Sequence, residues 1–380
     1  MAAGRSIGSS GNRATSALPL AGLYAALVVY ASLYPFAGWR DQGIAPWAFL
    51  ASPWPRYWTG FDLTANLLGY MPLGALLALA LLRSGAGTAA AVASGALAAA
   101  TLSLALEAVQ SYLPSRVASN LDFGLNALGA LLGAFAVAML QRMGWLMRWS
   151  RLRDLWFEPD ARGAMVLLLV WPLALLFPPA VPFGLGHMME RAEAALGSWL
   201  GNTPFLDWIP MREVELQPLW PATEAMCVSL GLLAPLLLVC CAARTPLRRA
   251  VLALLVAAAG VLASALSAAL TWGPAHAWAW IDPPVTAGAL AALVATVLLV
   301  WAPRRVCGAL LLMVLAAQLV LLNQAPASPY FAQTLQTWEQ GRFIRFHGLA
   351  QWLGWLWPPA VIAYLLAWIS RREAKPRIRA

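Results

Sequence analysis

Charged residues are scarce in this sequence: Asp, Glu, Lys and Arg make up 11% of its 380 residues, whereas 61% are hydrophobic. Water-soluble proteins carry about a quarter charged residues to cover their surface. The apolar residues here also form runs of about 20, the length of helix that crosses the hydrocarbon core of a bilayer. A water-soluble protein is therefore excluded, and the composition predicts an all-α, polytopic integral membrane protein.

Cysteine and histidine are also scarce, with four and three residues. All four cysteines lie in apolar runs without CxxC spacing or a nearby His, which indicates buried thiols and argues against a zinc site. They are Cys227, Cys240, Cys241 and Cys307. The sequence has no HExxH, P-loop or PSGH motif, and no GxSxG elbow with a His partner. No metal site is predicted, and no established catalytic motif is present.

Ten apolar segments are expected to cross the membrane as helices. They lie at residues 18–36, 64–82, 89–113, 121–141, 163–181, 222–243, 249–272, 284–302, 306–324 and 352–370. This division predicts three domains: a four-helix module at 1–142, a basic cytoplasmic linker at 143–162, and a six-helix membrane region at 163–380.

The net charge of +9 would suit nucleic-acid binding in a soluble protein, so the distribution of the charge decides its meaning. With ten spans, 18 of the 25 Lys and Arg residues fall on the side of the two termini and seven on the other side. Cytoplasmic loops carry this excess in membrane proteins. We therefore expect both termini in the cytoplasm and no nucleic acid as a partner.

The outer loops, at 37–63, 182–221 and 325–351, are rich in Trp and Pro, which places them on the outer leaflet. Residues 187–200 have the apolar spacing of a short helix, lying either on the membrane surface or packed over the bundle. In the third loop, Arg342, Arg345 and His347 form a secondary candidate site. They could bind lipid phosphate or a polyanionic glycan, or could instead pair with acids of the protein.

A spaced polar motif occurs twice in the first half of the chain. Segment 64–82 is introduced by Asp62-x-x-x-Asn66-x-x-Gly69, and segment 121–141 by Asp122-x-x-x-Asn126-x-x-Gly129. Positions i, i+4 and i+7 share one helix face. Because both segments are expected to run from the outside inward, the motif predicts two polar columns at the same depth, with glycines that let the helices approach closely.

Between these two segments lie Glu107, Gln110 and, after a proline, Arg116. The apolar run before them is longer than the bilayer needs, so Glu107 should lie near the outer boundary. The candidate ligand-binding residues are therefore Asp62, Asn66, Glu107, Gln110, Arg116, Asp122 and Asn126.

Each Asp of this set could instead be a simple helix cap, which is the commoner role of an acid at a helix start. Capping does not account for Asn66 and Asn126 one turn deeper, nor for Glu107, whose desolvation is costly unless it is paired or faces water. Taken together, the residues favour a functional site.

The segments DLTANLLGYMPLG, EAVQSYLPSR and DFGLNALGALLG resemble the VanZ-like family of bacterial membrane proteins, over roughly residues 20–140. The resemblance implies a cell-envelope protein of the bacterial inner membrane. The founding member of the family is associated with lower susceptibility to the glycopeptide teicoplanin, which makes antibiotic resistance an implied role.

Three functions are compared. The depth of the polar residues and the aromatic loops favour binding or modification of an outer-leaflet lipid-linked cell-wall or glycan component. An intramembrane enzyme with a Glu/Asp acid–base pair is the alternative; its oxygens would also suit Mg²⁺, although no cofactor is predicted. A transporter is less expected, because charges near the midplane and an inverted repeat are missing.

Overall fold

The computed structural model describes residues 17–34, 36–55, 58–177, 179–201, 203, 219–324 and 344–373. The chain divides into two compact units, Met1–Arg151 and Leu152–Ala380. The division falls within the stretch 143–162, where α5 (Trp145–Trp156) forms a short helix that carries Arg148, Arg151 and Arg153.

The described residues are helical without strands, and the protein is an all-α polytopic membrane protein. Seven helices are long and apolar enough to cross a membrane, and three shorter apolar helices, Ala17–Leu33, Arg162–Ala174 and Pro283–Leu299, accompany them. These ten helices lie at the ten predicted segments. All three shorter ones end earlier than predicted, and prolines follow each of them: Pro35 after the first, Pro178–Pro179 after the second and Pro303 after the third.

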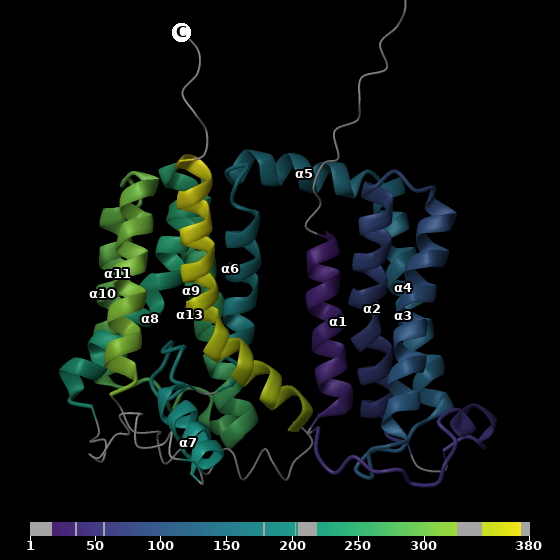
Figure 1. The fold of residues 1–380 in the computed structure, drawn as a ribbon. Helices are drawn as coiled ribbons and strands as arrows, with labels where there is room; N and C mark the ends of the chain where they lie inside the picture. The colour runs from purple at the N-terminus through teal and green to yellow at the C-terminus, as the bar shows by residue number, and fades with distance from the viewer. Residues whose placement is uncertain are drawn as a thin grey trace, which may run out of the picture. The chain divides into compact units, whose positions relative to one another are not determined.

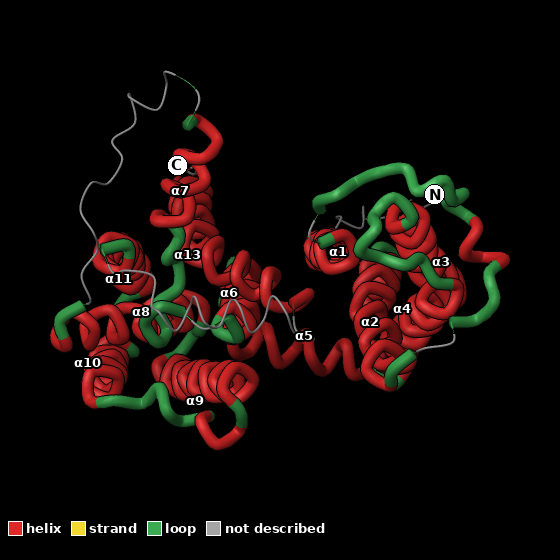
Figure 2. Tube along the Cα trace, turned by 90° about the horizontal axis from the view of Figure 1, so that it is seen from below, coloured by secondary structure: helices red, strands yellow, loops and turns green. Residues whose placement is uncertain are grey.

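The amino-terminal unit is a bundle of α1 (Ala17–Leu33), α2 (Gly60–Arg83), α3 (Thr88–Gln110) and α4 (Asn120–Arg142), with the short η1 (Ala48–Ala51) in the loop after α1. Consecutive helices run in opposite directions (Figure 1). As a result α2 and α4 are parallel, and Figure 2 shows α2 beside both α1 and α4.

The contact between α2 and α4 depends on glycine. A methyl group added at Gly129 would overlap the carbonyl oxygen of Leu67, and one at Gly133 would overlap that of Met71. These two pairs have the same separation along the chain, which confirms the predicted parallel packing at equal depth. Gly69 was predicted to act in the same way, and this was wrong: its Cβ position meets open space, and Gly74 is the glycine of α2 that lies against α4, at Ala130.

The carboxy-terminal unit contains α6 (Arg162–Ala174), α7 (Met189–Leu200), α8 (Pro221–Ala242), α9 (Pro246–Trp272), η3 (Pro274–His276), α10 (Pro283–Leu299), α11 (Arg304–Leu322) and α13 (Ile344–Glu373). Helix α8 lies between α6, α9, α10 and α11 (Figure 2). It is the central helix, because 78% of its apolar, membrane-spanning stretch is buried inside the protein, against 28–39% for the other long apolar helices. The helix predicted at 187–200 is present as α7.

All four cysteines are free thiols buried in the core of this unit, as predicted. The most buried charged side chain there is Arg249 of α9. Its guanidinium donates hydrogen bonds to the carbonyl oxygens of Ala243 (3.2 Å), Val300 (2.9 Å) and Ala302 (2.7 Å). These carbonyls lie at the carboxyl ends of α8 and α10, where the helix dipole favours a cation. Arg249 therefore joins three helices without requiring an acid.

A second polar junction holds the start of α6 against α11 and α13. The carboxylate of Asp160 accepts hydrogen bonds from Nη2 of Arg304 (2.9 Å) and from Nε1 of Trp368 (2.7 Å). The Arg304 guanidinium lies over the Trp368 ring and also donates from Nε to the carbonyl oxygen of Cys241 (2.7 Å). Segments far apart in the sequence are thus fastened at one end of the bundle.

Candidate functional site

The most buried acid in the amino-terminal unit is Glu107, in the last turn of α3, with 4% of its surface exposed. The backbone N–H of Ser119 donates a hydrogen bond to Oε2 of Glu107 at 2.9 Å. A carboxylate so deeply buried is costly unless hydrogen bonds and charges compensate it. Glu107 therefore lies in a polar environment that the protein itself provides, close to the end of the bundle where α3 ends and α4 begins.

Asn126 of α4 lies one helical turn deeper than Asp122 and is about as buried as Glu107. Its Nδ2 donates to Oγ of Ser103 at 2.9 Å, and Ser103 also shares a side-chain hydrogen bond with Tyr70 of α2. Tyr70 lies near enough to Glu107 for the two to interact electrostatically. We call Tyr70, Ser103, Glu107 and Asn126 the Glu107 cluster. It connects α2, α3 and α4 through buried polar groups.

One acceptor of the Glu107 cluster has no hydrogen-bond partner within the described residues, the Oδ1 atom of Asn126. Buried amide oxygens are nearly always satisfied by protein or by ordered water. This oxygen and the Glu107 carboxylate provide acceptors for the hydroxyl or amino groups of a polar ligand.

Asp62 and Asp122 occupy the same position, the third residue of α2 and of α4, but are used differently. At α2 the capping box is complete: Oδ2 of Asp62 accepts from the Thr59 backbone N–H at 3.2 Å, and Thr59 Oγ1 accepts from the Asp62 N–H at 3.2 Å. Asp62 is exposed. These contacts favour the capping interpretation of this residue.

At α4 only half of the same box forms. Oγ of Ser119 accepts from the Asp122 N–H at 3.3 Å, while the Ser119 N–H donates to Glu107 of the neighbouring helix. Asp122 is half-buried, in contrast to Asp62. Ser119 therefore links Glu107 to the start of α4 and holds the two acids in one neighbourhood.

Gln110 and Arg116 contact α1. Nε2 of Gln110 donates to the carbonyl oxygen of Ser32 at 3.0 Å, and Nη2 of Arg116 donates to those of Ala31 (3.4 Å) and Tyr34 (2.5 Å). A guanidinium on the last carbonyls of a helix stabilises its carboxyl end. These two residues thus anchor α1 beside the end of α3. Asn66 is half-buried in α2.

The loop after α1 is fastened over the end of α3. The backbone N–H of Arg40 donates to the Tyr112 carbonyl oxygen (3.0 Å), Gln42 Nε2 to that of Ser111 (2.7 Å), and Asn120 Nδ2 to that of Ser52 (2.6 Å). The loop exposes large apolar rings, as predicted. They are Trp39, Trp47, Trp54 and Trp58. The polar end of the bundle is thereby bordered by a tethered aromatic loop.

Sequence reasoning missed Tyr70, Ser103 and Ser119. Ser103 precedes Glu107 by four residues and Tyr70 follows Asn66 by four, so helical spacing could have added both. The secondary candidate Arg342 lies outside the described residues, as do the side chains of Arg345 and His347. In the described part of the chain, no group of three or more His, Cys, Asp or Glu residues is placed to hold a metal ion.

Comparison with known proteins agrees with the motif analysis. Residues 8–141 match the family model described as VanZ/LLP1, a range that contains the whole Glu107 cluster. No curated protein and no solved structure matches the chain. The resemblance drawn from the sequence motifs is confirmed over this range, and the protein is a polytopic membrane protein whose amino-terminal unit is similar to the VanZ/LLP1 family.

Proposed function

We propose that the amino-terminal unit binds an outer-leaflet lipid-linked cell-wall or glycan component at the Glu107 cluster, in the bacterial inner membrane. The observation that carries the proposal is that the same cluster contains a buried carboxylate, that of Glu107, and an unpartnered buried acceptor, Oδ1 of Asn126. Hydroxyl and amide groups of a glycan are donors that suit such acceptors.

The depth of the cluster supports a ligand that lies at the membrane boundary. Glu107 is three residues from the end of α3, and Ser119 immediately precedes α4. The exposed tryptophans of the tethered loop belong to the same end of this unit, and amphipathic rings of this kind lie at headgroup depth. A lipid-linked glycan has its polar part at that depth and its chain in the bilayer.

A second candidate is an acid–base enzyme acting on the same class of substrate. It is favoured by one observation: Ser119 donates its amide N–H to the Glu107 carboxylate and accepts at Oγ from the backbone N–H of Asp122, so the two acids lie at adjoining helix ends. Pairs of neighbouring carboxylates in different environments can divide the roles of acid and base. The same binding experiment separates the two functions, because only an enzyme changes the mass of the bound molecule.

The experiment is native mass spectrometry of the full-length protein after incubation with lipids extracted from the producing bacterium. Wild-type protein should retain a glycan-bearing lipid, and Glu107→Gln should lose it, because the amide keeps the shape but removes the charge. Asp62→Asn is the matched control, since the Asn side-chain oxygen can still accept from the Thr59 N–H in the capping box, and it should retain the lipid. Equal retention by wild type and Glu107→Gln would contradict the proposal.

Bacterial growth gives an independent measurement. At equal protein levels, Glu107→Gln and Asp122→Asn should abolish any change in teicoplanin susceptibility that the wild-type protein produces, whereas Asp62→Asn should preserve it. Full activity of the Glu107→Gln and Asp122→Asn variants would show that these two acids have a purely structural role.

A further inference from the structure

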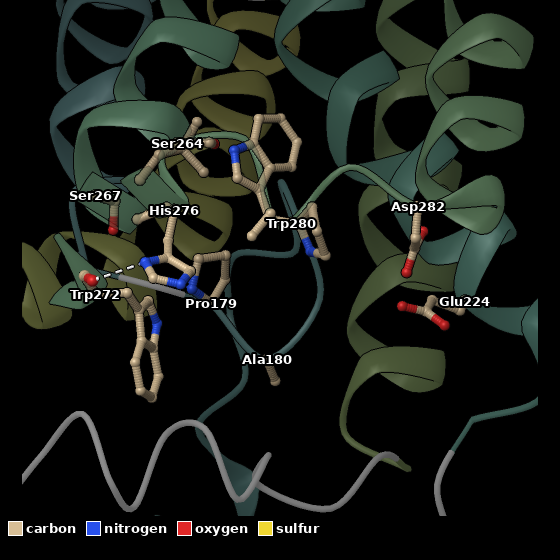
Figure 3. A pocket seen from close by; sticks show the side chains of 13 residues that line it. Pro179, Ala180, Glu224, Ser264, Ser267, Trp272, His276, Trp280 and Asp282 are labelled. Carbon is tan, nitrogen blue, oxygen red and sulfur yellow. Dashed lines mark hydrogen bonds between the residues drawn. The ribbon is translucent and has the colours of Figure 1, made fainter. Parts of the chain in front are cut away.

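The carboxy-terminal unit contains a cavity of about 470 Å³ at one end of its helical bundle (Figure 3). The cavity lies where α8 and α10 begin and where α9 ends. Part of its wall is apolar and comes from the segment after α6, including Pro179, Ala180 and Pro182. The volume is that of a site for a small organic molecule. None of these residues lies within the part of the chain that matches the VanZ/LLP1 family.

Two acids of this cavity face each other. Glu224 lies in the first turn of α8 and Asp282 is the N-cap of α10, and Figure 3 shows their carboxylates pointing toward one another. Asp282 Oδ1 accepts from the Val285 N–H at 2.8 Å. Asp282 therefore caps the start of α10.

The role of Glu224 is different. Among the described residues, no Lys or Arg forms an ion pair with it, and the charge that acts on it is that of Asp282. Two like charges at short range repel each other, and a cation placed between them removes this cost. The facing pair therefore has the arrangement of a cation-binding site.

A separate observation shows a polar group without a partner in the same cavity. Ser264 of α9 lines it, is only 9% exposed, and its Oγ has no hydrogen-bond partner within the described residues. One turn along the helix, Ser267 also lines the cavity, but its hydroxyl donates to the Leu176 carbonyl oxygen at 2.8 Å. The Ser264 hydroxyl is thus a buried donor and acceptor that a ligand could satisfy.

Two tryptophans complete the wall. The Trp280 ring is held by a hydrogen bond from Nε1 to the Ala277 carbonyl oxygen (3.0 Å) and by edge-to-face packing on Phe183 at 5.7 Å. The Trp272 carbonyl oxygen lies 3.0 Å from Nδ1 of His276. The face of an indole ring attracts a cation, so tryptophans in the wall of this cavity suit an organic ammonium group.

We propose that this cavity binds an amphiphile bearing a cationic amine. The ammonium group lies between Glu224 and Asp282, a second polar group of the ligand meets the Ser264 hydroxyl, and the apolar part lies against the tryptophans and prolines. The amine belongs either to a phospholipid headgroup or to a free amphiphilic amine, and both present the same chemistry to the site.

Native mass spectrometry of the full-length protein tests this with octylammonium and with octanol, a neutral molecule of similar length. Wild-type protein should retain octylammonium in clear preference to octanol. The double variant Glu224→Gln, Asp282→Asn should lose about tenfold in octylammonium affinity, the scale of one charge-assisted contact. Asp154→Asn removes an exposed acid of the same unit and should retain wild-type affinity.

Vesicles containing equal amounts of phosphatidylethanolamine and phosphatidylglycerol identify the source. Selective retention of phosphatidylethanolamine, lost in the double variant, assigns the amine to a lipid headgroup; retention of octylammonium alone assigns it to a free amine. Equal retention of octylammonium and octanol by wild-type protein would overturn the proposal, whether or not the double variant folds. Unchanged octylammonium affinity in a folded double variant would do the same.

Discussion

The backbone amide of Ser119 donates its hydrogen bond to Oε2 of Glu107, a side chain on the neighbouring helix, and not to the acid of its own helix. At α2 the equivalent amide, that of Thr59, donates within its own helix, to Asp62. The two copies of the repeated motif therefore differ in the partner of one N–H group. This difference separates a cap from a candidate ligand site.

Removing the acceptor at Glu107 should destabilise the amino-terminal unit. Glu107→Ala leaves the partly buried Ser119 N–H without this acceptor, and we expect a loss of about 1–3 kcal/mol in the free energy of unfolding. Glu107→Gln retains an acceptor oxygen and should lose less than half of that. Thermal unfolding of the purified variants measures both. Equal stability of Glu107→Ala and wild type would show that the hydrogen bond contributes nothing.

Gly133 of α4 and Gly69 of α2 should respond in opposite ways to alanine. At Gly133 a methyl group would overlap the Met71 carbonyl oxygen, so Gly133→Ala must push α2 and α4 apart. We expect a loss of about 2 kcal/mol or more. Gly69→Ala meets open space and should be neutral or stabilising by up to about 1 kcal/mol through helix propensity. Similar effects of the two substitutions on the melting temperature would contradict the packing described here.

These two glycines also show how far the sequence could predict the fold. Hydropathy and spacing were enough for the ten apolar helices and for the parallel relation of α2 and α4, because both follow from length and period. The choice between Gly69 and Gly74 as the contact glycine depends on the rotation of α2 about its axis, and a motif of one helix contains no information about that rotation.

The candidate site shows the same limit. Residue type and depth identified Glu107 and Asn126 as unusual, and both are buried. The contacts of Gln110 and Arg116 with α1 could not be predicted, because α1 itself carries no motif and offers only backbone carbonyls. Backbone groups are present at every position, so the sequence does not indicate which of them will receive a side chain.

The stability of the carboxy-terminal unit should fall in acid because of Asp160. Burial raises the pKa of Asp160, but the hydrogen bonds from Trp368 and Arg304 and the charge of Arg304 outweigh it and bring the pKa below its ordinary value. A lowered folded-state pKa means that the stabilisation is fully present above the unfolded-state pKa of about 3.9 and is lost as the pH falls through the folded-state value.

Asp160→Asn should therefore show a smaller loss of stability than wild type below about pH 4. Trp368→Phe removes one donor to the same carboxylate and should change the profile in the same direction. Melting temperature measured against pH checks both variants. A profile for Asp160→Asn that matches the wild-type profile would exclude this residue as the source of acid sensitivity.

The predicted membrane orientation can be tested with single cysteines, because the four native thiols are buried and should not react in the folded protein. Met147 of α5 is 65% exposed and Trp54 of the loop after α1 is 75% exposed. In intact cells whose outer membrane has been made permeable, a membrane-impermeant maleimide should label Trp54→Cys and not Met147→Cys, which should react only after lysis. Labelling of Met147→Cys before lysis would contradict a cytoplasmic location of α5.

Arg249 has a consequence for the biogenesis of the protein. Of its three carbonyl acceptors, only that of Ala243 precedes it in the chain, whereas Val300 and Ala302 follow it by about 50 residues. A nascent chain that has not yet reached α10 offers this guanidinium one of its three partners. The charge of Arg249 is therefore fully compensated only when α10 has been synthesised and has packed into the bundle. Folding of the carboxy-terminal unit around Arg249 has to wait for that step of synthesis.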